Sequence, residues 1–302
     1  NSGRMPPETF THLLTQPLAR STAPSMRETL RLDRVYRGAA KSQLLLLIEC
    51  LGELDALRTM ARSTERLGWI MPEVLERDQF VLEGEGLFHP LIDTPVANPI
   101  QLSGDEPLVF LTGPNMAGKT TYLRTAALAL LLAQIGMGVP ARRLRFTPVE
   151  VLLTSLNPSD NLRAGLSFFL SEVHRVREAA TFLAEGRRCF ILFDEVFKGT
   201  NVKDALDASS TVILGFAKAR ASGFIFSSHL VELVETLRVD SRIRFHSFDG
   251  RVAEGKAEYS YEMRSRVSDE RLGLHLLGEA RIPELLEKIA LGNPIRSKSV
   301  QS

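Results

Sequence analysis

The chain is poor in cysteine, with only Cys50 and Cys189 among its 302 residues. Both lie inside apolar patterns without a CxxC pair or neighbouring histidines, which argues against a zinc site and against a disulfide. We therefore predict that both thiols lie in the core of a protein from a reducing compartment, and we expect a cytoplasmic location.

An excess of one charge is also lacking. Lysine and arginine together number 37, and aspartate and glutamate together number 36. This balance gives no general attraction to nucleic acid or to an anionic membrane. A DNA-binding role would need a local basic patch or a further segment.

Long apolar runs are absent as well. The longest, Ala126–Ala133, is followed by Gln134 and by glycines before Pro140, and it falls short of the roughly 20 apolar residues that a membrane helix needs. The first residues show no signal-peptide pattern, so no membrane contact is expected. Because the chain starts with Asn1 instead of methionine, we expect the natural protein to be longer.

The most informative segment present is "TGPNMAGKTTYLRT", which lies between the apolar runs "PLVFL" and "AALALLLAQIG". It fits the pattern G-x-x-x-x-G-K-[ST] in the context of strand, turn and helix, whose backbone N–H groups hold phosphates. A plain glycine-rich turn is the alternative, but both flanking elements favour a nucleotide site. We predict that Lys119 contacts the β- and γ-phosphates, that Thr120 binds Mg²⁺, and that the nucleotide site includes Gly113, Pro114, Asn115, Met116, Ala117, Gly118, Lys119, Thr120 and Thr121.

Two further strand ends carry polar side chains. "CFILFDE" ends in Asp194 and Glu195, and we predict that Asp194 holds Mg²⁺ while Glu195 acts as the general base toward water. "GFIFSSHL" ends near His229, which is predicted to contact the γ-phosphate or to orient the attacking water. A solvated acidic pair and a structural histidine are the alternatives.

The rest of the chain predicts an α/β fold with a mainly parallel sheet flanked by helices, because apolar strands alternate with helical patterns. We divide it into an irregular lead-in (1–41), a helical lever segment (42–83), an ATPase domain (84–268) and a C-terminal helical dimerisation segment (269–302). The lever is predicted from apolar residues at helical spacing at Leu47, Leu51, Leu54 and Leu57.

The motifs "TGPNMAGKTTYLRT", "AGLSFFLSEVHRV", "LFDEVFKGTN" and "SSHL", in this order, resemble the ATPase domain of the MutS family of DNA mismatch-repair proteins. The resemblance implies a P-loop NTPase of ABC type, with Asn115 facing the γ-phosphate and with Val96 and Asn98 bordering the adenine. It also implies that Ser167 is presented to ATP in the opposite subunit and that Asp204 belongs to the loop linking the two sites.

Three departures from the family pattern point to a divergent paralogue. Ala117 replaces a glycine, "LSFFLSEV" replaces the usual signature, and Phe197 and Lys198 replace glycine and arginine. The family's mismatch-reading domain and clamp arms do not fit into the first eighty or so residues. Mismatch recognition by this polypeptide alone is therefore not expected.

The function expected from the sequence is that of an ATP- and Mg²⁺-dependent ATPase module of a DNA-processing protein, acting as a nucleotide-switched dimer. The partner is a second copy or a longer MutS-like subunit, and DNA binding by this chain alone is expected to be weak. One alternative is an ABC-transporter nucleotide-binding subunit, but it needs an LSGGQ-like signature that "LSFFLSEV" does not provide. Another is a scaffold that binds ATP without turnover.

Overall fold

The computed structural model describes residues 25–156, 168–197, 199–253 and 256–267, together with positions 282, 286 and 287. Contacts within the chain divide it into two units, residues 1–65 and 66–302. Ser167, Lys198 and most of the expected C-terminal helical pair lie outside the described residues.

The first unit is helical where it is described. It contains α2 (Met26–Arg34), a π-helix η1 (Val35–Ala39) and most of α3 (Lys41–Leu67). The long helix predicted after residue 42 is confirmed, whereas part of the expected irregular lead-in is helical. An ion pair of 2.6 Å between Asp33 and Arg37, one turn apart, supports this helical stretch.

The apolar residues of α3 are exposed in the described part of this unit: Leu51, Leu54 and Leu57 are all more than half exposed. Cys50 lies on the same helix and is also exposed, so the prediction that it is a core thiol is wrong. Its apolar neighbours suggested burial, but they are themselves uncovered here. The prediction for Cys189, which is buried, is confirmed.

The second unit is built on a six-stranded sheet with the order β10-β9-β4-β8-β7-β6. In this sheet the pairs β4–β8, β4–β9, β6–β7 and β7–β8 are parallel, and β10 runs antiparallel to β9. The predicted mainly parallel sheet is confirmed; its strands are β4 (Leu108–Thr112), β6 (Val151–Ser155), β7 (Cys189–Asp194), β8 (Gly223–Ser227), β9 (Ile243–Ala253) and β10 (Lys256–Arg264).

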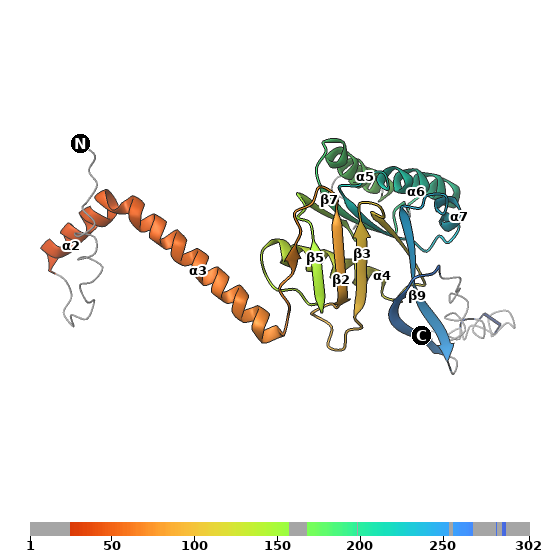
Figure 1. The fold of residues 1–302 in the computed structure, drawn as a ribbon, viewed down its shortest axis with the longest axis horizontal. Helices are drawn as coiled ribbons and strands as arrows, with labels where there is room; N and C mark the ends of the chain where they lie inside the picture. Colours follow the sequence, from red (N-terminus) through yellow and green to blue (C-terminus); the bar gives the residue numbers. More distant parts are fainter. Residues whose placement is uncertain are drawn as a thin grey trace, which may run out of the picture. The chain divides into compact units, whose positions relative to one another are not determined.

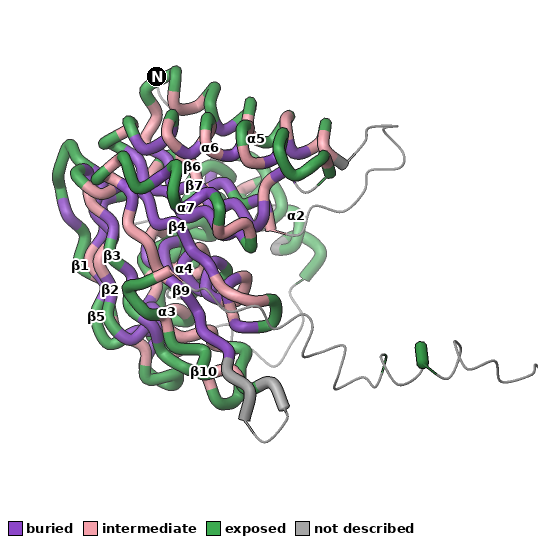
Figure 2. The backbone as a smooth tube through the Cα atoms, turned by 90° about the vertical axis from the view of Figure 1, so that its right-hand side faces the viewer, coloured by how far each residue is buried: buried purple, intermediate pink, exposed green. Residues whose placement is uncertain are grey.

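Helices cover both faces of this sheet, and β4, β7 and β8 are buried along their whole length. Figure 2 shows this burial at β4 and β7. Figure 1 shows α5, α6 and α7 gathered on one side, where they pack on Phe110, Phe193 and Phe226. The opposite side, which includes Val109 and Leu111, packs against α4. The helices are α4 (Lys119–Gln134), α5 (Phe168–Ala184), α6 (Val202–Phe216) and α7 (Leu233–Leu237).

A smaller sheet covers the far side of α4 and completes the core. Its strand order is β1-β5-β2-β3, and Leu82, Ile100 and Phe146 pack in one cluster with Leu123 and Leu130 of α4. The strands are β1 (Glu73–Val74), β2 (Val81–Leu87), β3 (Asn98–Ser103) and β5 (Arg143–Phe146).

This architecture places α4 between two sheets. It also directs the carboxyl ends of β4, β7, β8 and β9 to one edge, because these strands are parallel. Among the described helices, none combines the length and apolarity needed to cross a bilayer.

Candidate functional site

The predicted phosphate loop connects β4 to α4. Its backbone has positive φ angles at Gly113 (136°), Met116 (68°) and Gly118 (110°). A Cβ on Gly113 would lie 2.3 Å from the carbonyl oxygen of Phe248, so only glycine fits there. No side chain caps the start of α4, and a helix N-terminus with open N–H groups favours an anion.

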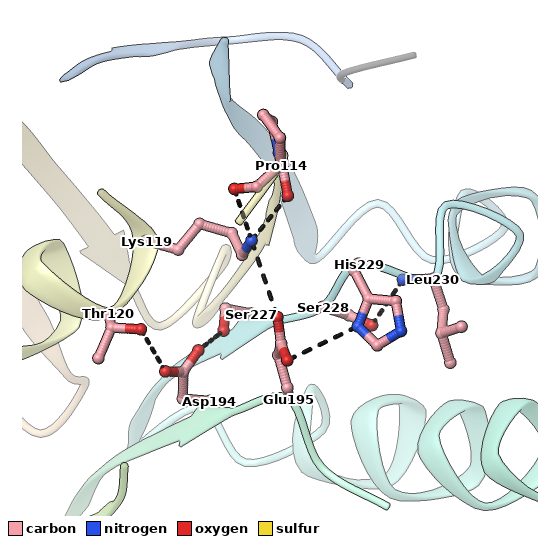
Figure 3. A network of polar contacts seen from close by, with 10 residues as sticks. Pro114, Lys119, Thr120, Asp194, Glu195, Ser227, Ser228, His229 and Leu230 are labelled. Atoms are coloured by element: carbon pink, nitrogen blue, oxygen red, sulfur yellow. Dashed lines mark hydrogen bonds and ion pairs between the residues drawn. The ribbon is translucent and has the colours of Figure 1, made fainter. Parts of the chain in front are cut away.

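The ammonium group of Lys119 lies inside this loop (Figure 3). Its Nζ donates to the carbonyl oxygens of Gly113 (2.6 Å) and Pro114 (3.1 Å), and it lies 3.8 Å from Oε1 of Glu195. The lysine is almost completely buried. These carbonyl groups hold the positive charge at the centre of the loop, where a phosphate oxygen can reach it.

Asp194, the last residue of β7, joins α4 and β8. It accepts hydrogen bonds from Thr120 Oγ1 (2.5 Å) and from Ser227 Oγ (Figure 3). The structure thus brings together the two residues predicted to bind magnesium. It also adds Ser227, which the sequence reasoning missed although it precedes the strand-end serine and histidine.

Glu195 follows directly and has a left-handed backbone conformation (φ 55°). Its N–H donates to the carbonyl oxygen of Ser227 (2.9 Å), which ties the end of β7 to the end of β8. Its Oε2 lies 3.7 Å from Nδ1 of His229. Glu195 is nearly buried whereas His229 is about half exposed, so the predicted base and its histidine neighbour meet at the surface of the site.

A cavity of about 340 Å³ is lined by Lys119, Asp194 and Glu195, whereas His229 is not among its lining residues. Asn115 and Thr121, both predicted to bind nucleotide, line it together with the lysine and the two acids. Ala117 does not: its side chain is fully buried in the core, and its N–H donates to the carbonyl oxygen of Pro114 (3.4 Å). The lining is completed by Pro114, Met116, Gly118, Thr120 and Tyr261.

A second cavity of about 340 Å³ adjoins the first and has a more apolar wall. The two cavities share Gly118, Thr121 and Tyr261. Val96, predicted to contact the base, lines the second cavity with Tyr122, Phe248, His89, Ile92 and Pro95.

Tyr122 and Phe248 form the inner wall of this apolar cavity, with ring centroids 5.8 Å apart. The hydroxyl of Tyr122 donates to the carbonyl oxygen of Pro99 (2.8 Å), and burial raises the pKa of Tyr122 above its usual range. The sequence reasoning missed Tyr122, Phe248 and Tyr261, because aromatic residues in a helix and in two strands are usually part of the core.

Asn98 also belongs to the wall of this cavity, but its amide group is engaged with the main chain. Its Nδ2 donates to the carbonyl oxygen of Tyr261 (2.9 Å), and its Oδ1 accepts from the N–H of Met263 (2.7 Å). Both partners lie in β10. Asn98 therefore lines this cavity with its polar atoms directed to a neighbouring strand, and its predicted contact with adenine stays a prediction.

Asp204 lies in the first turn of α6 and lines neither cavity. Its N–H donates to Oδ1 of Asn201 (2.9 Å), and its Oδ2 accepts from Nδ2 of the same residue (2.6 Å). This reciprocal pairing caps the helix. The role expected for Asp204 in a loop between two sites stays a prediction, as does that of Ser167, which lies outside the described residues.

The donor set fits Mg²⁺ better than a transition metal. In the part of the chain that the structure describes, no three His, Cys, Asp or Glu side chains gather as a metal site of their own. Asp194 and Thr120 supply a carboxylate and a hydroxyl oxygen at one point. Mg²⁺ is usually held by one or two protein oxygens together with substrate phosphates and water, and these two residues fit such a site.

These features define an α/β domain in which a phosphate-loop sequence, two acids and a histidine meet at the carboxyl edge of a parallel sheet. The family model described as MutS domain V matches residues 109–292. The chain therefore belongs to the MutS domain V family.

Two curated relatives agree with this assignment. The chain is 30% identical over 255 residues to the DNA mismatch repair protein MutS of Geobacillus thermodenitrificans (strain NG80-2), a match that covers 82% of this chain and 27% of that protein. It is 28% identical over 250 residues to the DNA mismatch repair protein MutS of Bacillus pumilus (strain SAFR-032), covering 81% of this chain and 29% of that protein. The chain thus spans less than a third of the length of these relatives.

Proposed function

We propose that this chain is the ATP-binding and ATP-hydrolysing module of a MutS-like DNA-repair or DNA-processing protein, with the P-loop fold of ABC-type ATPases. The observation that carries the proposal is the position of Glu195. Its carboxylate lies between Lys119 of the phosphate loop (3.8 Å) and His229 of the neighbouring strand end (3.7 Å). A carboxylate beside the phosphate site is placed to accept a proton from an attacking water.

The residues of the chain divide the work of ATP hydrolysis. Lys119 and the open N-terminus of α4 bind the β- and γ-phosphates, and Thr120 and Asp194 hold Mg²⁺, which neutralises charge developing on the phosphates. Asn115 faces the γ-phosphate from the loop. Glu195 accepts the proton of the water that attacks the γ-phosphorus, and the products are ADP and phosphate.

His229 orients this water or contacts the γ-phosphate. Its ring is half exposed and so is accessible to a ligand from the solvent side. Its Nδ1 lies 3.7 Å from Oε2 of Glu195, which is too long for a direct hydrogen bond and too short to admit a water between the two atoms, so a water held by both side chains lies beside the pair.

The nucleoside part of ATP occupies the apolar cavity next to the loop. Val96 and the ring of Tyr261 contact it, since both line that cavity and Tyr261 also lines the phosphate cavity. An apolar wall with few polar groups is the usual form of a small-molecule site.

The assembly proposed for this module is an ATP-dependent dimer, with a second copy or with a longer MutS-like subunit. Ser167 and Asp204 contribute to the opposite site, residues 42–83 form a lever, and residues 269–302 take part in dimerisation. Residues 84–268 are the ATPase domain. We propose cytoplasmic action on DNA within the complete protein or assembly.

Turnover of ATP tests the proposal. Purified chain is incubated with ATP and Mg²⁺, and phosphate release is compared with that of the Glu195→Gln variant. We expect Mg²⁺-dependent release that falls at least about a hundredfold in the variant. Tight ATP binding with equal, negligible release from both proteins would instead support the ATP-binding scaffold.

A further inference from the structure

Strand β10 contains a wide irregularity beside the candidate nucleotide site. Tyr259 pairs with Gly250 of β9, and Met263 pairs with Phe248, so that residues 260–262 of β10 lie opposite the single residue Asp249. Tyr261, at the centre of this bulge, has a φ of 56°. Aromatic residues rarely adopt this left-handed conformation, and the surrounding structure must therefore hold it.

Asn98 holds both the centre and the end of the bulge from the neighbouring sheet. It is the first residue of β3. Its Oδ1 accepts a hydrogen bond from the N–H of Met263 (2.7 Å), and its Nδ2 donates one to the carbonyl oxygen of Tyr261 (2.9 Å). Only 8% of Asn98 is exposed. A buried amide that satisfies two main-chain groups in this way fixes a conformation, since removing it leaves those groups without a partner.

The bulge determines where the ring of Tyr261 lies. That ring forms part of the wall shared by the apolar cavity and the phosphate cavity. Its Cδ1 lies 3.4 Å from the position that a Cβ on Gly118 would occupy. With 46% of its surface exposed, Tyr261 can contact a ligand that runs from one cavity to the other.

We infer that Asn98 is a positioning residue, which sets the affinity for the nucleoside part of ATP by holding the β10 bulge and thereby the ring of Tyr261. The inference rests on the proposed function, because it assumes that ATP occupies both cavities. It assigns Asn98 an indirect role in place of direct contact with the base. Binding of the triphosphate part by the loop and α4 does not depend on the hydrogen bonds that Asn98 makes to β10.

Comparison of two ligands tests this inference. Dissociation constants for ATP and for inorganic tripolyphosphate, both with Mg²⁺, are measured by calorimetry in a Glu195→Gln background that limits hydrolysis. We expect Asn98→Ala and Tyr261→Ala each to weaken ATP binding about tenfold and to leave tripolyphosphate binding within twofold. The double variant is expected to be no weaker than the weaker single variant, because both changes act through one ring.

Matched variants separate positioning from loss of fold. Thr147→Val removes another buried side-chain to main-chain hydrogen bond, to the N–H of Val81 in the same small sheet, and should leave the ratio of the two affinities unchanged. If Asn98→Ala does not fold, Asn98→Asp retains the acceptor for Met263 and loses the donor to Tyr261. It should then reduce ATP affinity selectively.

Each other outcome has a distinct meaning. If the parent protein binds neither ligand, the proposed function fails. If the parent binds ATP, three results show that the positioning role is wrong while the proposed function stands. The Asn98 variants retain full ATP affinity, or they weaken the binding of ATP and of tripolyphosphate equally, or their loss of ATP affinity adds in full to that of Tyr261→Ala.

Discussion

The ring centroids of Phe169 and Phe197 lie 5.7 Å apart, which joins the first turn of α5 to the turn that follows Glu195. Phe197 is buried, with a relative exposure of 3%, and has a φ of 65°. Glycine, which is usual at this position in the family that the sequence resembles, adopts such a conformation without strain. In this chain the contact of the buried Phe197 ring with Phe169 offsets the strain of a side chain there.

This relationship predicts an unusual order of stabilities at position 197. Phe197→Ala removes the ring and retains the strained backbone, at a cost of about 3–5 kcal/mol. Phe197→Gly removes the same ring but also relieves strain of about 1–2 kcal/mol. We therefore expect the glycine variant to unfold at higher urea concentration than the alanine variant.

Equilibrium unfolding in urea, followed by circular dichroism, measures this difference. Phe193→Ala and Phe193→Gly in β7 are matched controls, because Phe193 is also buried and stacked on a ring, that of Phe226, but is not among the residues with positive φ. There alanine should be the more stable of the two. The same order at both positions would contradict the strain argument.

The second prediction separates the roles of Glu195 and Lys119. Glu195→Ala should retain ATP affinity and lose most turnover, because it removes only the proton acceptor. Lys119→Ala should weaken ATP binding as well, since it removes the charge that the loop presents to phosphate. Titration with a fluorescent ATP analogue measures both affinities, and an equal loss of affinity would show that the roles are wrongly assigned.

The third prediction concerns Ser227, whose hydroxyl donates to Asp194. Residues that orient a metal ligand typically change metal affinity by about 10–100-fold when they are removed. Ser227→Ala should therefore raise the Mg²⁺ concentration needed for half-maximal ATPase activity by about tenfold, with a smaller effect at saturating Mg²⁺.

Ser228→Ala is the control for this measurement. Ser228 is the next residue and is also buried, but its hydroxyl accepts from the N–H of Leu230. An equal change in Mg²⁺ dependence in both variants would indicate a general disturbance of the strand end, without a specific role for Ser227.

Much of this site could be predicted from local sequence. The loop needs glycine at Gly113 and Gly118, and the acids follow a continuous apolar strand, so that a few consecutive residues determine both the element and its chemistry. The mainly parallel sheet followed from the same apolar runs. The parallel pairing of β4 with β8 and β9, and of β7 with β8, confirms this sheet.

Contacts between distant residues could not be predicted in this way. Asn98 meets Tyr261 across 163 positions, and the position of Tyr261 depends on a bulge that no local pattern marks. Cys50 shows the opposite failure: its apolar neighbours resemble a core, but burial depends on what covers α3. Hydrophobic periodicity identifies a helix face without identifying its partner.

The fourth prediction concerns DNA. With 37 basic and 36 acidic residues, the chain should bind duplex DNA weakly, and binding should fade between low and physiological salt as counterions compete. No preference for a mismatched duplex is expected. Fluorescence anisotropy with matched and mismatched duplexes at two salt concentrations measures this, and a several-fold mismatch preference at physiological salt would overturn it.

The last prediction is that the active ATPase is a dimer with shared sites, Lys119 acting from one subunit and Ser167 from the other. Ser167→Ala and Lys119→Ala proteins should each be inactive alone. When they are mixed, one site of the mixed dimer carries both changes and the other carries neither, so ATPase activity should return to about a quarter of the wild-type value, because random pairing makes half of the dimers mixed. Size-exclusion chromatography with light scattering verifies that mixed dimers form. If they form without activity, the serine acts within its own subunit or the two sites work only together, and the shared-site proposal as stated is wrong.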